Sequence, residues 1–150
     1  MLTSTTLSLT KRCASERAVH SFPDCGRPAP YNSLISKRPM LYTSGQKQRP
    51  RLAQQVYRFM LDQEPLLGAA TVTVHHRRLT SEGVVGWQQE DGQEFLVEVE
   101  RDLPKADYIL TLIHELIHCR QTLEGIMDEE QRETEAYGLE TVYAARFAAA

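Results

Sequence analysis

The run from Ile109 to His118 constrains the fold more than any other part of this chain. It is mostly apolar and contains the letters HELIH at residues 114–118, an HExxH motif. Residues four apart share one face of a helix, so the motif predicts a helix on which both imidazoles point at one metal ion. Glu115 lies about 100° around the helix from His114 and can reach a water molecule at the metal without being a ligand. Many zinc hydrolases have this arrangement, which therefore indicates a metal-dependent hydrolase.

The first fifty residues differ in composition from the rest of the chain. Residues 1–50 hold eight Lys/Arg against two acidic residues, and five of the seven prolines. Residues 51–150 hold nine Lys/Arg against eighteen acidic residues, so the two parts carry formal charges of +6 and −9. No apolar periodicity is visible in the first part. We therefore predict a basic, Pro/Ser/Thr-rich flexible leader over 1–50 and one folded domain over 51–150.

The leader and the cysteines bear on where the protein resides. The leader lacks the continuous apolar core of a secretory signal or a membrane span. The chain has three cysteines, Cys13, Cys25 and Cys119, an odd count without framework spacing, which favours a reducing compartment. We therefore expect a cytoplasmic protein with no membrane partner. A basic, acid-poor leader is also typical of organelle transit peptides, so that alternative stays open. The net charge of −3 gives no reason to expect a nucleic-acid partner.

Residues 51–150 show an ordered series of elements. Apolar residues spaced three and four apart predict a first helix over Arg51–Gln63. Alternating patterns predict three strands, and Asp91-Gly92 is a hairpin signal between the last two. These strands are expected at Thr71–Arg78, Gly83–Gln88 and Phe95–Glu100. A helix carrying the HExxH motif should then run from about Lys105 to Thr122, followed by a glutamate-rich helix capped by Asp128 and continuing towards Phe147. The predicted fold class is α+β, with a small, mostly antiparallel three-stranded sheet.

A catalytic zinc ion usually has a third protein ligand. None of the five histidines follows His118, so a ligand from downstream must be a carboxylate. The downstream candidates are Glu124, Asp128, Glu129, Glu130, Glu133, Glu135 and Glu140. All but Glu124 belong to the last predicted helix, which can pack antiparallel to the motif helix and direct one side chain at the metal.

Here the sequence resembles the gluzincin class of zinc metallopeptidases. In that class a second helix follows HExxH, and its ligand glutamate typically stands directly before alanine, as Glu135-Ala136 does here. The resemblance covers about residues 106–147 and implies a minimal zincin-like domain in which His114, His118 and Glu135 bind Zn²⁺. Glu133 is the main rival for the third position. Larger members place an acid four residues after the ligand glutamate to support a histidine. Leu139 stands there in this chain, and the adjacent Glu140 is the candidate for that supporting role.

The leading functional hypothesis is a zinc metallopeptidase acting on a peptide or protein substrate. Glu115 would act as general base towards a zinc-activated water and then protonate the leaving amine. Phe95–Glu100 would be the sheet edge that pairs with an extended substrate. The alternative is a non-catalytic zinc-binding interaction or regulatory domain. A di-iron protein would need two ExxH motifs on a four-helix bundle, and this chain has only one such motif.

Several other side chains could lie near the site. One of His75 and His76 could stabilise an oxyanion, although a core or surface position is the simpler interpretation on a strand. Tyr137, Tyr108 and Arg120 could likewise support the site or belong to the core. Cys119 is expected to be a small core residue.

Overall fold

The computed structural model describes residues 40–150, except for the side chain of Trp87. Residues 1–39 of the predicted leader lie outside this range. The strands are β1 (Met40–Gly45), β2 (Thr71–Arg77), β3 (Gly86–Asp91) and β4 (Glu94–Glu100). The α-helices are α1 (Pro50–Gln63), α2 (Lys105–Glu124) and α3 (Glu129–Ala149), and short 3-10 turns occupy Pro65–Ala69 (η1) and Thr80–Glu82 (η2). The predicted order of helices and strands from Arg51 onwards is confirmed.

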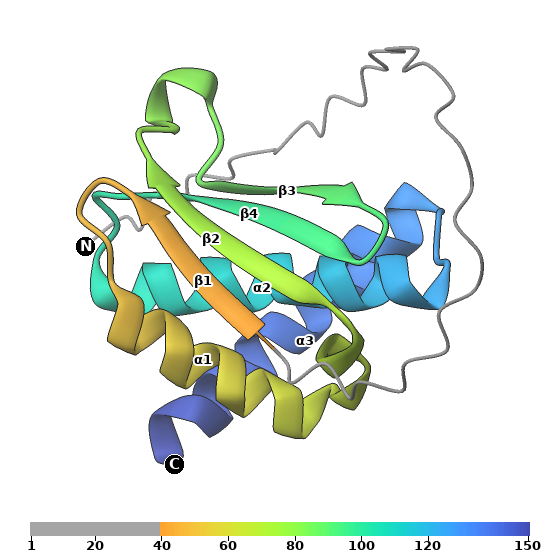
Figure 1. Ribbon diagram of the computed structural model, residues 1–150. Helices are drawn as coiled ribbons and strands as arrows, with labels where there is room; N and C mark the ends of the chain where they lie inside the picture. The colour runs from red at the N-terminus through yellow and green to blue at the C-terminus, as the bar shows by residue number, and fades with distance from the viewer. Residues whose placement is uncertain (1–39) are drawn as a thin grey trace, which may run out of the picture. The chain divides into compact units, whose positions relative to one another are not determined.

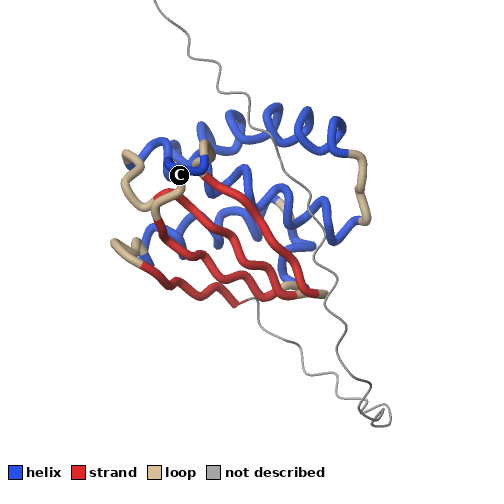
Figure 2. The backbone as a smooth tube through the Cα atoms, turned by 90° about the horizontal axis from the view of Figure 1, so that it is seen from above, coloured by secondary structure: helices blue, strands red, loops and turns tan. Residues whose placement is uncertain are grey.

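The sheet is larger than predicted and mixed rather than antiparallel. Its order is β1-β2-β4-β3, with β1 parallel to β2, β2 parallel to β4, and β3 antiparallel to β4 (Figures 1 and 2). The α+β class is therefore confirmed, whereas the prediction of a three-stranded, mostly antiparallel sheet was wrong. The missing strand is β1, which lies inside the predicted leader 1–50. It lacks an apolar alternation, and it is fixed by the crossover through α1 that brings the chain back parallel to it as β2.

The predicted substrate-pairing edge, Phe95–Glu100, is not an edge. These residues form most of β4, which has β2 on one side and β3 on the other. The inner strand of the β3–β4 hairpin carries buried Phe95, Val97 and Val99, whereas the partner strand at the edge has the polar sequence GWQQED. A polar strand suits an edge because its outer backbone groups face water. The hairpin turns at Gly92, with φ of 63°, as the Asp91-Gly92 signal predicted.

The helices cover one face of the sheet. In Figure 1, α2 runs beneath the sheet with α1 in front of it, and α3 lies against α2. Val72, Val74 and His76 of β2 are buried, in strict alternation with half-buried neighbours on the opposite face. This alternation follows from the two-residue period of a strand. The apolar core therefore lies between the sheet and the α1–α2 pair.

The connection between α2 and α3 has clear end signals. Gly125 ends α2 in the left-handed conformation, with φ of 77° and its N–H donating to the carbonyls of Gln121 and Thr122. Asp128 caps α3, because its carboxylate accepts from the N–H of Gln131 at 2.8 Å. The two helices that carry the predicted metal ligands are thereby joined by a short, well-defined turn. Within residues 40–150, no helix combines the length and apolar character needed to cross a bilayer.

Candidate metal centre

Helix α2 is buried around most of its circumference over the motif. Every residue from Thr111 to Gln121 is buried, because the sheet covers one side of α2 and α3 covers another. The motif residues His114, Glu115 and His118 thus lie inside the protein although they are polar. Buried polar groups need partners, since leaving one unpaired costs several kcal/mol in an apolar environment. The partners of these three side chains therefore define what the site can do.

Two histidines from α2 and one glutamate from α3 bring their polar atoms together. The Nε2 atoms of His114 and His118 are 2.9 Å apart. The carboxylate of Glu133 lies 3.6 Å from Nε2 of His114 and 3.2 Å from Nε2 of His118. One ligand atom from each of the three residues lies within 4.8 Å of the other two. The two histidines are buried, whereas about a quarter of the Glu133 side chain is exposed, so this centre is open towards solvent on the α3 side.

The other ring nitrogen of each histidine has its own partner. Nδ1 of His114 lies 2.6 Å from Oε2 of Glu140, the residue that the sequence offered as a support for a histidine ligand. Nδ1 of His118 lies 2.8 Å from Oε1 of Gln121. Both partners are acceptors, so each Nδ1 carries the proton and each Nε2 presents its lone pair. Metal-binding histidines commonly have this arrangement, with an outer acceptor fixing the tautomer.

The convergence of two ring nitrogens and a carboxylate favours a positive charge at this point. The contacts with His114 and His118 hold the pKa of the Glu133 carboxyl well below its ordinary value, so this carboxylate is ionised. A proton on one Nε2 or a divalent cation would satisfy the cluster. Two imidazole nitrogens and a carboxylate oxygen are a donor set that zinc accepts, and tetrahedral ligands at its usual bond lengths lie roughly 3.3 Å apart. The residues present therefore fit a zinc ion, with the fourth position open to water.

Glu115 occupies a niche between α2 and the edge strand β3. Its side chain is buried, and a Cβ placed on Gly86 would come within 2.7 Å of its Oε1 and of Cγ2 of Thr111. Only glycine leaves room for the carboxylate at this point of the strand. The predicted general base therefore lies against β3, the edge strand of the described sheet, on the same helix as both histidines.

The structure brings Glu133 to the histidines and places Glu135 elsewhere. The carboxylate of Glu135 lies 3.0 Å from the guanidinium of Arg120 and 2.7 Å from Nε2 of Gln121. It therefore contacts a residue that holds His118 rather than the histidines themselves. The carboxylate that meets the two histidines is that of Glu133, the rival that the sequence left open, and Glu135 contacts Arg120 and Gln121 instead. Its neighbour Ala136 packs fully buried against the core.

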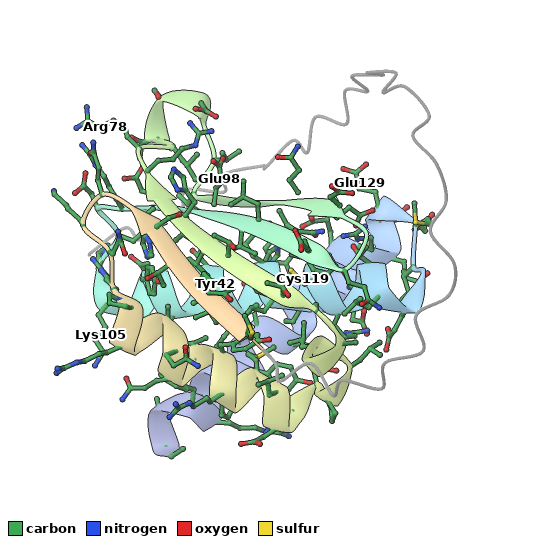
Figure 3. All side chains as sticks on the ribbon, in the orientation of Figure 1. Tyr42, Arg78, Glu98, Lys105, Cys119 and Glu129 are labelled. Atoms are coloured by element: carbon green, nitrogen blue, oxygen red, sulfur yellow. The ribbon has the colours of Figure 1, made fainter. Side chains whose placement is uncertain are left out.

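The remaining predicted candidates lie in the core, on the sheet or beside the candidate centre. His76 and Tyr108 are core residues bound to each other, and His75 pairs with the Ser44 hydroxyl. Tyr137 is close to the site, with its ring centroid 5.0 Å from that of His114. Cys119 is fully buried on α2, where burial raises the pKa of its thiol (Figure 3).

Sequence reasoning missed two residues that organise the site. Gln121 holds His118, and its position three residues later on the same helix face was a usable signal. Arg132 donates to the carbonyl of His118 at 3.4 Å and to the side chain of Gln88 at 3.3 Å, so it ties α3 to the end of α2 and to β3. Nothing in the local sequence marks that contact.

Comparisons with protein-family models, curated proteins and solved structures find no match to this chain.

Proposed function

We propose that this protein is a zinc-dependent hydrolase of peptide bonds, with His114, His118 and Glu133 as the metal ligands. The observation that carries the proposal is the meeting of the two Nε2 atoms and the Glu133 carboxylate, with Nδ1 of each histidine already held by an acceptor. The hydrogen bonds at Nδ1 thus orient both imidazoles so that, with Glu133, three ligand atoms face one cation. Glu115, between the two histidines in sequence, gives this set a base that is not itself a ligand.

The residues divide the chemistry between them. A zinc ion in this position supplies Lewis acidity, which lowers the pKa of water and polarises a carbonyl oxygen. Glu115 accepts the proton of the attacking water and returns it to the leaving amine, so that one carboxylate serves as base and then as acid. Glu140 and Gln121 keep the Nε2 lone pairs of the two histidines directed at the ion. Tyr137 is the aromatic residue of α3 beside His114 and is the first candidate for contact with the substrate.

The free edge of β3 supports a peptide as the substrate class. An extended peptide can add to an exposed strand through main-chain hydrogen bonds. Within residues 40–150, β3 is paired with β4 on one side only, and Gly86 of this strand lies directly against Glu115. A peptide paired along β3 would therefore pass the proposed base. This replaces the sequence-based expectation that Phe95–Glu100 pairs with substrate.

The decisive test is Glu115→Gln in the full chain, with zinc content and peptide hydrolysis measured on the same sample. We expect full zinc occupancy and a loss of hydrolysis of about 100-fold or more, the range over which a positioned acid–base group acts. Glu129→Gln, an exposed residue in the first turn of α3, is the matched control and should change neither. Unchanged hydrolysis in the Glu115 variant would refute the proposed mechanism.

One observation favours the alternative, a zinc module without catalysis. Glu115 is only 3% exposed, which is also how a purely structural carboxylate would be placed. In that case the wild-type protein would bind zinc and cleave no member of a broad peptide library. The Glu115→Gln variant would then differ from wild type in stability alone.

A further inference from the structure

We propose that Glu135 and Arg120 are positioning residues that hold His118 in its metal-binding tautomer by acting through Gln121. This inference rests on the zinc centre proposed above and extends it outwards by two residues. It also gives Glu135 a role other than the ligand role that the sequence suggested.

A continuous path of contacts joins these residues to the centre. The guanidinium of Arg120 lies 3.0 Å from Oε1 of Glu135. Oε2 of the same carboxylate accepts from the amide of Gln121 at 2.7 Å, and Oε1 of Gln121 accepts from Nδ1 of His118 at 2.8 Å. The path therefore runs from a charge on α2, through α3, and back to a ligand on α2.

The orientation of the Gln121 amide determines which ring nitrogen of His118 carries the proton. An amide can turn over, which exchanges its oxygen acceptor and its nitrogen donor. In the observed orientation the nitrogen donates to two acceptors, Glu135 Oε2 and the carbonyl of Arg132 at 2.9 Å. The reversed amide would place its oxygen against both acceptors and its N–H against His118. Glu135 thus opposes reversal, and the amide oxygen in turn keeps the proton of His118 on Nδ1.

Arg120 fixes the carboxylate that performs this task. Arg120 is buried, at 4% exposure, and lies among Glu64, Glu124 and Glu135. A buried guanidinium holds its carboxylate partners in place because leaving it unpaired is costly. Of these three acids, Glu135 is the one that the structure places in hydrogen-bond contact with Gln121. Glu124 lies 2.5 Å from Arg120 and has a similarly exposed side chain, so it offers a matched control on the same guanidinium.

The first test measures zinc affinity of the full chain by competition with a chromophoric chelator. Gln121→Met should weaken zinc binding about 10- to 100-fold, the usual effect of removing an outer partner of a ligand histidine. Glu135→Ala acts one step further out and should weaken it about three- to tenfold. Glu124→Ala should leave the affinity unchanged. Equal effects of the Glu124 and Glu135 substitutions would overturn the proposal, because both remove a carboxylate from Arg120 and only one touches the path.

The second test reports on His118 without requiring metal. Nitrogen-15 chemical shifts of histidine-labelled, metal-free protein distinguish a ring protonated at Nδ1 from one protonated at Nε2. We expect His118 to be protonated at Nδ1 in wild type and in Glu124→Ala, and to shift towards a mixture in Glu135→Ala. Glu135→Gln serves if the alanine variant does not fold, and a smaller shift in the same direction is expected. An unchanged tautomer would refute the positioning role, whereas the expected shift in a protein that binds no zinc would refute the proposed function alone.

Discussion

The buried histidine of the core, His76, and the two buried histidines of the proposed centre, His114 and His118, differ in what their Nε2 atoms contact. His76, in the core between β2 and α2, has Nδ1 at 3.1 Å from the carbonyl of Ser44 and Nε2 at 2.9 Å from the hydroxyl of Tyr108. Its ring stacks on Tyr108, with 5.6 Å between centroids. At the centre on α2, Nδ1 is likewise held, but the Nε2 atoms of His114 and His118 face each other and Glu133. His76 thus has a partner at each ring nitrogen, whereas the proposed centre directs two Nε2 atoms and a carboxylate at one point, where a cation could bind.

This difference distinguishes the core histidine from the proposed metal ligands better than burial does. His76 and His114 are almost equally buried, at 1% and 2% exposure. A carbonyl and a hydroxyl can satisfy a neutral imidazole, one as acceptor and the other as donor. Two Nε2 atoms that converge with a carboxylate are instead the arrangement expected of a metal site. The contrast between the two groups can be tested by changing each in turn.

The largest effect is expected from His118→Ala. Structural zinc sites bind with roughly 10–16 kcal/mol, so the loss of one of three protein ligands should cost about 4 kcal/mol, or about a thousandfold in affinity. His76→Phe is the comparison variant and should bind zinc as wild type does. Competition with a chromophoric chelator measures both. Equal zinc affinity in His118→Ala and wild type would mean that the cluster is not a metal centre.

The next effect concerns the acceptor behind His114. Glu140→Gln should weaken zinc binding about 10- to 100-fold while leaving the ligands in place. The reason is that the amide is a weaker acceptor than the carboxylate 2.6 Å from Nδ1, so the imidazole loses basicity. Glu129→Gln is the control. If affinity is retained, the Glu140 contact is packing rather than support of a ligand.

A smaller effect on folding stability is expected from His76→Phe. The substitution removes the hydrogen bonds to Ser44 and Tyr108 and should lower the free energy of unfolding by about 1–2 kcal/mol. Urea denaturation monitored by circular dichroism gives the value. Zinc should stabilise this variant and wild type by the same increment, because the core histidine is not part of the centre. A larger increment in either protein would show that the two groups are coupled.

The smallest effect is the pH dependence that His76 contributes. Burial lowers the pKa of His76 in the folded protein, so the unfolded chain takes up the proton first as pH falls. Its contribution to stability is therefore fully present above about pH 6.5, the unfolded value, and is lost as pH falls below it. The loss of unfolding free energy between pH 7.5 and pH 5 should be smaller in His76→Phe than in wild type. An identical loss in both proteins would contradict a neutral core histidine.

The regular elements were readable from the sequence because their patterns are local. The stripe of α1, the alternation of β2 and β4 and the Asp128 cap each depend on residues close in the chain. β1 was not readable, since its pairing with β2 joins Met40 to Thr71 across a whole helix. The position of β4 inside the sheet was missed for the same reason, because strand order is decided by contacts between distant segments.

The centre was readable in its residue types and less so in their places. Both histidines and the need for a carboxylate followed from the motif. The choice between Glu133 and Glu135 depended on which face of α3 meets α2. Ala136 and Tyr143 are the buried residues of α3, and Glu133 and Glu140 continue their spacing of three and four residues, whereas Glu135 lies off that line. The resemblance placed weight on the Glu-Ala pair, whereas the apolar stripe indicates that Glu133 is the residue that meets the histidines.

The short connection between α2 and α3 also bears on the order of folding. His118 and Glu133 are fifteen residues apart, whereas Met40 and Thr71, the first partners of β1 and β2, are thirty-one apart. Closing a loop half as long costs about 0.6 kcal/mol less chain entropy, and helices form faster than parallel strands pair. The side chains of the proposed centre are therefore brought together over a shorter stretch of chain than β1 and β2 are. We expect α2 and α3 to pack together, and so to bring His114, His118 and Glu133 close to one another, before the strands of the sheet pair.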